Sequence, residues 1–494
     1  MTLTRLAAAL AALFALGACS MAPKLEQPAL TTAIPDNLRS DIAWTTAPDA
    51  VPMDALWWRR LNDPLLAQWQ DELLKSNPSI ELSLAQYRAA RAAVDSADAA
   101  LWPTLNLSAS QTRSQTGSAS RATGVATAVG TTTSYATAVQ AAWELDLWGR
   151  LRNGTQAAQG DLASAAAVVG NARLSAQALL AQSVVLWRVA MAQEALLDRS
   201  VRAYARFKDL TQLRFEAGVA SRLDVAQANT LLNNTRTRLA EATLVRTQSE
   251  NAIAAVLGRV PASMDWAAMA QRYPVFTGQT IPDVPAPPEL LSSTVLQGRY
   301  DVLAAQARVK AANARIGVAR AAYFPVISLA ASSGYRSTVL SNLFDTPARV
   351  WSVGPALALN LFDAGARSAA VEAAFAQMDQ AVATYRQTVV TAFQEVEDNL
   401  AAVKLLEREQ QSQAQALESA WLARDIAQAQ YTAGTADSLN VISTQVSALD
   451  AEATAITLWG RRMVALINLL KNTSGQALQA ESASVGRVAA PAGQ

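Results

Sequence analysis

The sequence of 494 residues contains no histidine and only one cysteine, Cys19. Without imidazole, Ser-His-Asp and Cys-His catalysis and histidine metal sites are excluded. A single cysteine cannot form a disulfide bond within the chain. The sequence also lacks a P-loop, a Gly-x-Gly-x-x-Gly motif and a Ser-x-x-Lys motif. We therefore expect no enzyme, no cofactor and no metal site.

Charged residues are scarce as well, at 16% of the chain, and the 41 basic and 40 acidic side chains leave a net charge of +1. Nucleic-acid-binding domains usually carry a basic patch, so this composition excludes nucleic acid as an expected partner. Beyond the first residues no segment offers about 18 uninterrupted apolar residues, so we expect no mature transmembrane helix. The length exceeds what one ordinary compact core needs.

The N-terminus has the shape of a secretory signal peptide over residues 1–18, with Arg5 before an apolar run from Leu6 to Ala18. Its ending, Leu-Gly-Ala-Cys, resembles a bacterial lipobox, in which the cysteine becomes the acylated first residue. An ordinary signal peptide that happens to contain a cysteine is the alternative. Acyl chains on Cys19 would anchor the protein in outer membrane lipid. Ser20 follows instead of Asp, and by resemblance to bacterial lipoproteins this favours the outer membrane.

Four segments show the alternation of apolar and polar residues that is typical of strands, over residues 104–112, 134–147, 325–334 and 349–362. Each is about ten residues long, with aromatic residues near its ends. Transmembrane barrel strands show this pattern, and so does a soluble sandwich with one wet face. Four strands cannot close a barrel, and an open sheet edge is not tolerated in lipid. If the strands cross a membrane, several chains must share one barrel.

Long alanine-rich helical hairpins follow each pair of strands, over residues 149–258 and 364–471, and each is interrupted by one glycine, Gly218 or Gly434. At 1.5 Å per residue, the first helix of each hairpin would be about 100 Å long. The last helix has an apolar spacing of alternating three and four residues, which predicts a coiled-coil seam. That seam comprises Leu439, Ile442, Val446, Leu449, Ala453, Ile456, Gly460, Met463, Ile467 and Leu470.

The chain therefore contains an internal duplication. We expect a lipidated, extended N-terminal arm over 19–60, two repeats over 61–285 and 286–472, and a flexible tail over 473–494. The first repeat would consist of helices at 63–101, strands at 104–112 and 134–147, a hairpin at 149–258 and a proline-rich linker at 259–285. The second would consist of a helix at 289–322, strands at 325–334 and 349–362 and a hairpin at 364–471.

Short motifs along nearly the whole chain resemble the TolC family of outer membrane channels, in the OprM- and NodT-like lipoprotein branch. They are Trp57-Trp58, Asp63-Pro64, Asn77-Pro78, Trp102-Pro103, DLWGRLR at 146–152, AANARIGVARAAYFPVISL at 311–329, LNLFDAGAR at 359–367 and both Ala-Gly turns. One departure is Tyr300, where the branch usually has proline, and this leaves the local helix start open.

The resemblance implies an α+β fold in which a homotrimer shares one membrane β-barrel, four strands per chain, continuous with a long periplasmic α-helical barrel. It implies a passive duct for drugs or other small toxic compounds in the Gram-negative outer membrane. The implied partners are a periplasmic adaptor protein and an inner membrane pump of the RND type. A type I protein secretion channel, or a periplasmic coiled-coil scaffold, is the alternative.

The two glycine turns are the main candidate sites, and the resemblance places them at the periplasmic tips of the duct. Adaptor contacts are expected at Gly218, Val219, Gly434 and Thr435. Gate residues are expected at Asp224, Asn440, Tyr431, Arg214 and Arg222. For Asp224, a partnership with the helix N-terminus is the alternative. Glu144 and Asp146 are expected on the lumen-facing side of a strand, or else as caps of the helix that follows.

Overall fold

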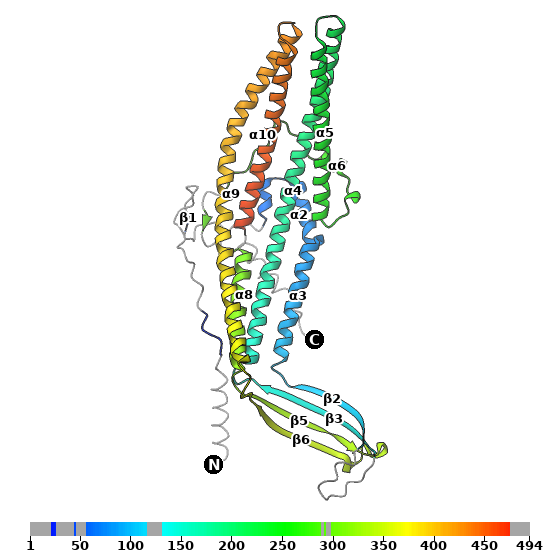
Figure 1. The fold of residues 1–494 in the computed structure, drawn as a ribbon, viewed down its shortest axis with the longest axis vertical. Helices are drawn as coiled ribbons and strands as arrows, with labels where there is room; N and C mark the ends of the chain where they lie inside the picture. The colour runs from blue at the N-terminus through cyan, green and yellow to red at the C-terminus, as the bar shows by residue number, and fades with distance from the viewer. Residues whose placement is uncertain are drawn as a thin grey trace. The chain divides into compact units, whose positions relative to one another are not determined.

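The computed structural model describes residues 21–25, 44–45, 56–115, 131–287, 291–292 and 298–474 (Figure 1). The expected acylation site at Cys19, the signal peptide, most of the N-terminal arm and the tail from residue 475 lie outside these residues. The chain divides into two compact units. The first contains residues 1–29, 86–165 and 304–385, and the second contains residues 30–85, 166–303 and 386–494.

The first unit contains one antiparallel sheet of four strands in the order β2-β3-β5-β6 (Figure 1). Its strands are β2 (Thr104–Gln115), β3 (Thr131–Leu145), β5 (Val326–Ser337) and β6 (Arg349–Ala358). The prediction of four strands in two pairs is confirmed. Strands β3 and β5, which lie far apart in sequence, pair at the centre of the sheet.

The register gives this sheet one apolar face. Leu107 pairs with Val139, and Ala331 pairs with Val353. Directly paired residues of an antiparallel sheet lie on the same face, so the apolar residues of all four strands coincide. These side chains are not covered within the chain, since Leu107 is 76% exposed and Trp351 is 71% exposed. The opposite face carries small and polar residues, among them Ser332 and Ser352, whose hydroxyls lie 2.8 Å apart.

Six of the eight strand ends differ from the predictions by one to four residues, and two of these differences matter here. Strand β6 stops at Ala358, so the expected extension to residue 362 is wrong. Asp146 lies beyond the end of β3, so its expected place on a strand is wrong too. The carboxylate of Asp146 instead accepts hydrogen bonds from Leu151 N at 3.1 Å and Arg152 N at 2.9 Å. Free amide groups of a helix start attract a carboxylate, and this explains why Asp146 serves the helix that begins at residue 150.

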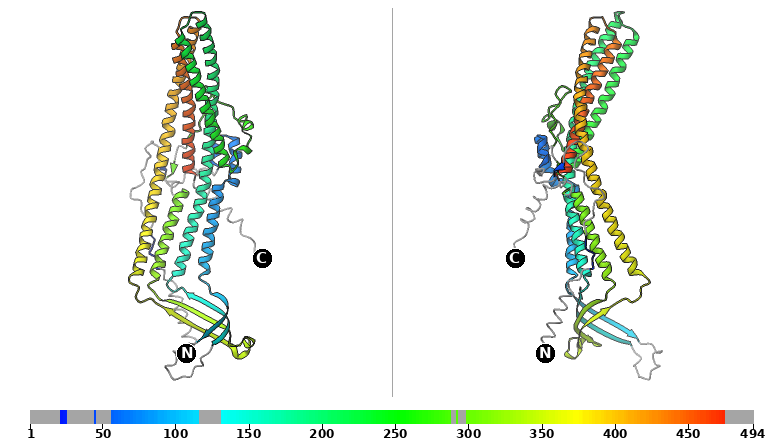
Figure 2. Two further views of the ribbon diagram at one scale, coloured as in Figure 1. Left: turned by 45° about the vertical axis from the view of Figure 1, so that its right-hand side comes forward. Right: turned by 90° about the vertical axis from the view of Figure 1, so that its left-hand side faces the viewer.

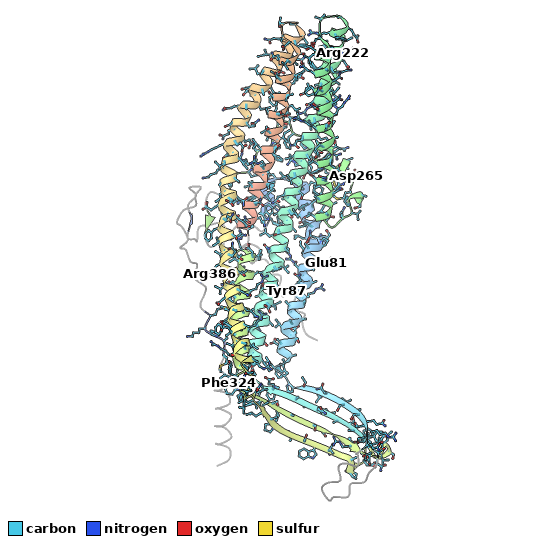
Figure 3. All side chains as sticks on the ribbon, in the orientation of Figure 1. Glu81, Tyr87, Arg222, Asp265, Phe324 and Arg386 are labelled. Atoms are coloured by element: carbon cyan, nitrogen blue, oxygen red, sulfur yellow. The ribbon has the colours of Figure 1, made fainter. Side chains whose placement is uncertain are left out.

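An aromatic pair fixes the joint between the sheet and the helices of the first unit. The rings of Trp148 and Phe324 are stacked with their centroids 4.7 Å apart. The indole of Trp148 also donates to Pro325 O at 2.8 Å. Phe324, labelled in Figure 3, lies between helix α8 (Tyr300–Ala321) and strand β5.

The second unit holds the glycine-turn ends of the two helical hairpins. The first hairpin consists of α4 (Arg150–Glu216) and α5 (Arg222–Val256), and the second of α9 (Ala366–Thr432) and α10 (Ser438–Thr473). Figures 1 and 2 show that the two helices of each hairpin lie side by side. Helix α4 includes a stretch that is long and apolar enough to cross a membrane, but 67% of it is buried in the structure. Packing against other helices accounts for that apolar composition.

Aromatic residues from separate segments form the core of the second unit. The ring of Trp187 on α4 contacts Trp69 of helix α2 (Pro64–Ser76), Trp266 of helix α6 (Trp266–Ala270) and Tyr273. The region expected to be a linker, residues 259–285, therefore supplies core residues. The expected arm does so as well, because Trp57 and Trp58, in a short 3-10 helix, are buried.

One expected helix start needs correction, and another agrees with the structure. Helix α8 begins at Tyr300 and not at residue 289. Leu291–Ser292 (β4) instead pairs in parallel with Trp44–Thr45 (β1), a long-range contact that local periodicity does not report. Helix α3 (Pro78–Ala99) starts after Asn77, as the Asn-Pro motif predicts, and Asn77 Oδ1 accepts from Ile80 N at 3.0 Å.

The expected seam of α10 is buried only in part. Ile456, Gly460, Met463, Ile467 and Leu470 are buried, but Leu439 is 57% exposed. Nearer the turn Leu449 is also buried, but the other buried positions are Ser438, Val441, Gln445, Ala448 and Glu452, a face shifted around the helix. At Gly460 a β-carbon would lie 2.6 Å from Val189 Cγ2, and its absence lets α10 approach α4 closely.

Candidate functional site at the hairpin turns

Both hairpin turns have the same backbone geometry. Gly218 and Gly434 have positive φ angles of 75° and 80°. Val219 N donates to Arg214 O at 2.8 Å, and Gly218 N donates to Phe215 O at 2.9 Å. The second turn repeats the pattern with Thr435 and Gly434, at 2.9 and 3.1 Å. This pair of bonds is the Schellman motif, which requires a left-handed residue, so each glycine is used for its conformational freedom.

The helices after the turns are capped differently. Ser221 and Asp224 form a reciprocal capping box at the start of α5, in which Ser221 N donates to Asp224 Oδ2 at 2.7 Å. In the second turn Asp437 is the cap and accepts from Asn440 N at 2.9 Å. Asp224 and Asn440 occupy equivalent positions, but only Asp224 has a capping role through its side chain.

An arginine joins the two hairpins next to the turns. The guanidinium of Arg214 donates to Tyr431 O at 2.7 Å and lies 4.2 Å from the centre of the Tyr431 ring. The Tyr431 hydroxyl lies 3.2 Å from Thr211 Oγ1, and its ring lies 5.4 Å from that of Phe207. Tyr431 is 3% exposed, in a small apolar cluster with Phe207, Ala228, Ala427 and Val441.

Asp224 makes the second link between the hairpins. Its Oδ1 atom accepts a hydrogen bond from the hydroxyl of Ser438, the first residue of α10. Hydrogen bonds from Ser438 and Ser221 stabilise the charged carboxylate and hold the pKa of Asp224 below its ordinary value. Asp224 therefore caps the N-terminus of α5 and also links the two turns through Ser438. We call the Arg214–Tyr431 and Asp224–Ser438 contacts the tip clamp.

The structure does not bring all the expected gate residues together. Arg214, Tyr431 and Asp224 lie in the tip clamp, whereas Arg222 and Asn440 are exposed and make no side-chain contact within the described part of the chain. Figure 3 labels Arg222 at the turn of the first hairpin. The expected adaptor residues Val219 and Thr435 are exposed beside the two glycines.

The sequence analysis did not select Ser438, Thr211, Phe207 or Asp437. The Ser-x-x-Asp spacing of Ser221 and Asp224 is a recognisable capping signal, but the contact with Ser438 depends on how two hairpins pack. Near the sheet, Glu144 lies on strand β3 and binds Arg150, with Nη2 2.7 Å from Oε2. No cluster of three or more His, Cys, Asp or Glu side chains suited to a metal ion occurs among the residues that the structure describes.

Comparison with known proteins shows which family the chain resembles. The model of the family described as outer membrane efflux protein matches residues 69–259 and 291–475. The chain is 33% identical over 471 residues to outer membrane protein OprJ of Pseudomonas aeruginosa, covering 93% of each protein. It is 30% identical over 471 residues to the toluene efflux pump outer membrane protein TtgC of Pseudomonas putida, covering 94% of this chain and 93% of that one.

A solved structure agrees over most of the chain. A membrane protein from Pseudomonas aeruginosa superposes with a TM-score of 0.79 at 32% identity. The match covers 92% of this chain and 100% of that protein. The similarity therefore extends over both the sheet and the hairpins.

Proposed function

Since this chain belongs to the outer membrane efflux protein family and is an outer membrane efflux component, we propose that three copies form one passive duct for small toxic compounds. The relative named as a toluene efflux protein supports small-molecule cargo over protein cargo. The duct would receive its cargo from an inner membrane pump of the RND type through a periplasmic adaptor. Cys19, acylated, would add a lipid anchor.

The observation that carries the proposal is the sheet with one exposed apolar face. Leu105, Leu107, Trp351, Val353 and Leu357 are each more than 60% exposed. A soluble protein would cover such a face, whereas barrel strands turn it toward lipid. Strands of 10 to 15 residues are long enough to cross the hydrocarbon layer when tilted.

The edges of the sheet support closure by further copies. Strands β2 and β6 are the outer strands of the four-stranded sheet. Lipid contains no partner for the free backbone groups of an edge strand, so both edges need a strand from another chain. The sheet is antiparallel throughout, so β6 of one copy and β2 of the next run in the directions needed for another antiparallel pair. Three copies would supply twelve strands.

The hairpin turns supply the other end of the proposed duct. Exposed apolar side chains gather there, with Val219 76% exposed, Leu223 65% and Leu439 57%. We assign the adaptor contact to this surface, with Gly218, Gly434 and Thr435 beside it. The tip clamp would hold the two hairpins of one chain together when the duct is closed. No residue is proposed to catalyse a reaction.

The proposal is tested by purifying the protein from outer membranes and reconstituting it in planar lipid bilayers. We expect heat-modifiable trimers, discrete single-channel conductance, and restored drug resistance in a strain that lacks its own outer membrane channels but has a matching pump and adaptor. A monomer without conductance that restores no resistance would overturn the duct.

The turn glycines allow a sharper test. A tryptophan at Gly434 must adopt a φ of 80°, which costs roughly 1–2 kcal/mol, and would project into open space, since no atom lies within 4 Å of the position of a β-carbon. We expect Gly434→Trp to leave trimers intact and to abolish resistance by obstructing the adaptor surface. Gly354→Trp, also in open space but on strand β6 of the first unit, is the comparison away from the turns. Normal resistance with Gly434→Trp contradicts the assignment.

A further inference from the structure

A short N-terminal segment, Met21–Leu25, lies against helix α8 in the first unit. Asn313 on α8 donates from Nδ2 to Pro23 O at 3.0 Å. One turn further along the helix, Gly317 faces the same segment, because a β-carbon there would lie 2.8 Å from Ala22 N. These contacts join residues almost 300 positions apart in the sequence, and both involve the backbone of the segment.

Gly317 is needed for this close approach. A β-carbon at residue 317 would also lie 2.5 Å from Nδ2 of Asn153 on α4, and contacts below 3.0 Å force a shift. Glycine within a helix costs about 1 kcal/mol relative to alanine. The cost is offset here because the missing side chain leaves a notch between α8 and α4. Asn153 is 1% exposed and forms the floor of this notch.

The segment is held through its backbone, and its side chains contribute little to the contact. Ala22 is small, and Pro23 restricts the residue before it to extended conformations. The proline also has no N–H group to leave unpaired, while its carbonyl is the acceptor that Asn313 uses. Lys24 and Leu25 are exposed. The docked part is therefore a short stretch of backbone held at Ala22 and Pro23.

We propose that Asn313, Gly317 and Asn153 form a docking site for the mature N-terminal segment, which holds the acylated end of the chain at a fixed position beside the membrane sheet. The acyl chain is part of the proposed function, on which this inference rests. Three residues of chain span at most about 10 Å, so an anchor three residues before Ala22 would be held on a tether of that length. Gly317 is four residues from the end of α8, a rise of about 6 Å.

The consequence is a fixed register between two membrane-attached parts of one chain. If the segment were not docked, the depth of the lipid anchor in the membrane would not constrain the depth of the sheet. With the segment docked on α8, the helix that leads into strand β5 also carries the lipid anchor. The docking site therefore sets the depth of the sheet relative to the leaflet that holds the acyl chains.

A nitroxide at residue 24 tests the docking. Lys24→Cys gives the only free thiol once the sulfur of Cys19 carries lipid, because the chain has no other cysteine. In detergent-purified trimers we expect a slowly moving label. Gly317→Val should displace the segment and give fast motion, and Asn313→Ala, which removes the hydrogen bond to Pro23 O, should give a mixture. Gly154→Val on α4, where no atom lies within 4 Å of a β-carbon, is the matched control and should stay slow.

A label that moves fast in the parent trimer, or one that stays slow in both Gly317→Val and Asn313→Ala, overturns the docking site. If Gly317→Val does not form trimers, the motion of the label in Asn313→Ala still tests the docking site. A Cys19→Ala variant, exported with a cleavable signal that lacks a lipobox, carries no acyl chain. The same measurement on this variant separates docking from acylation, and we expect the label to move slowly there too. Conductance of the same samples tests the duct independently, so the two proposals fail separately.

Discussion

Arg214 offers the clearest test of the tip clamp, because one side chain makes two kinds of contact with the other hairpin. Its guanidinium donates to Tyr431 O at 2.7 Å and lies 4.2 Å from the Tyr431 ring centre. Arg214→Met keeps most of the aliphatic stem but removes the charge. The control is Arg222→Met, which removes an equal charge at the same turn from a side chain with no contact among the described residues.

The size of the effect follows from the two contacts. A hydrogen bond from a charged donor contributes about 1.5 kcal/mol at the low end of the usual range. A partly exposed cation–π contact adds about 0.5 kcal/mol. Together they give roughly 2 kcal/mol, which corresponds to about a 30-fold change in a local opening equilibrium. Arg214 is only partly buried, so the low end of each range applies.

Hydrogen exchange followed by mass spectrometry measures this opening directly. In Arg214→Met trimers we expect amides of peptides covering 213–224 and 430–441 to exchange about 30-fold faster. Peptides of the four-stranded sheet should be unchanged, and Arg222→Met should remain within about twofold of the parent at both turns. Equal acceleration by the two variants, or none by Arg214→Met, would refute the clamp. Acceleration of the first turn alone would show that Arg214 stabilises only its own hairpin.

Three further predictions concern other parts of the chain. The pKa of Asp224 is lower in the folded state than in the unfolded state. Its contribution to the stability of the turns is therefore present above the unfolded pKa and is lost as the pH falls through the folded pKa. Hydrogen exchange at the turns should accelerate below about pH 4 in the parent protein but not in Asp224→Asn. Gly170→Val should lower the unfolding temperature of trimers, because a β-carbon there would lie 2.6 Å from Tyr300 Cδ1. Overpacking of this kind costs about 1–3 kcal/mol. Gly154→Val, where no atom lies within 4 Å of a β-carbon, should have a smaller effect. Leu107→Lys on the apolar face of β2 should cost about 2–4 kcal/mol and reduce trimer yield, whereas Ser108→Lys on the other face should not.

The strands could be predicted well because their pattern is local. Each strand alternates in sequence, and the register places apolar residues of one strand beside apolar residues of the next, as Leu107 and Val139 show. The ends were less predictable. Leu359 and Leu361 continue the alternation beyond Ala358, but pairing with β5 ends there, and pairing is what defines a strand.

Contacts between distant segments could not be predicted from periodicity. The start of α8 at Tyr300, where the resembling branch has proline, depends on a partner on another helix. Gly170 on α4 leaves the space that the Tyr300 ring fills. The same limit applies to the linker, since Tyr273 packs against Trp187 of another segment and its hydroxyl donates to Asp63 Oδ1 at 2.6 Å.

The tip clamp uses different side chains from the two copies of the turn. Each contact joins positions that are not equivalent in the duplication. Tyr431 is three residues before its glycine, the place of Phe215 in the first turn, and Ser438 is four residues after, the place of Arg222.

A symmetric clamp would need a cation at Gln430 and a carboxylate at Asn440, facing Phe215 and Arg222. The described residues show no such contacts, and both charged groups of the clamp, Arg214 and Asp224, come from the first copy. The second copy contributes a carbonyl, an aromatic ring and a hydroxyl. Because the first copy supplies both charges, the second copy needs only neutral acceptors and donors beside its glycine.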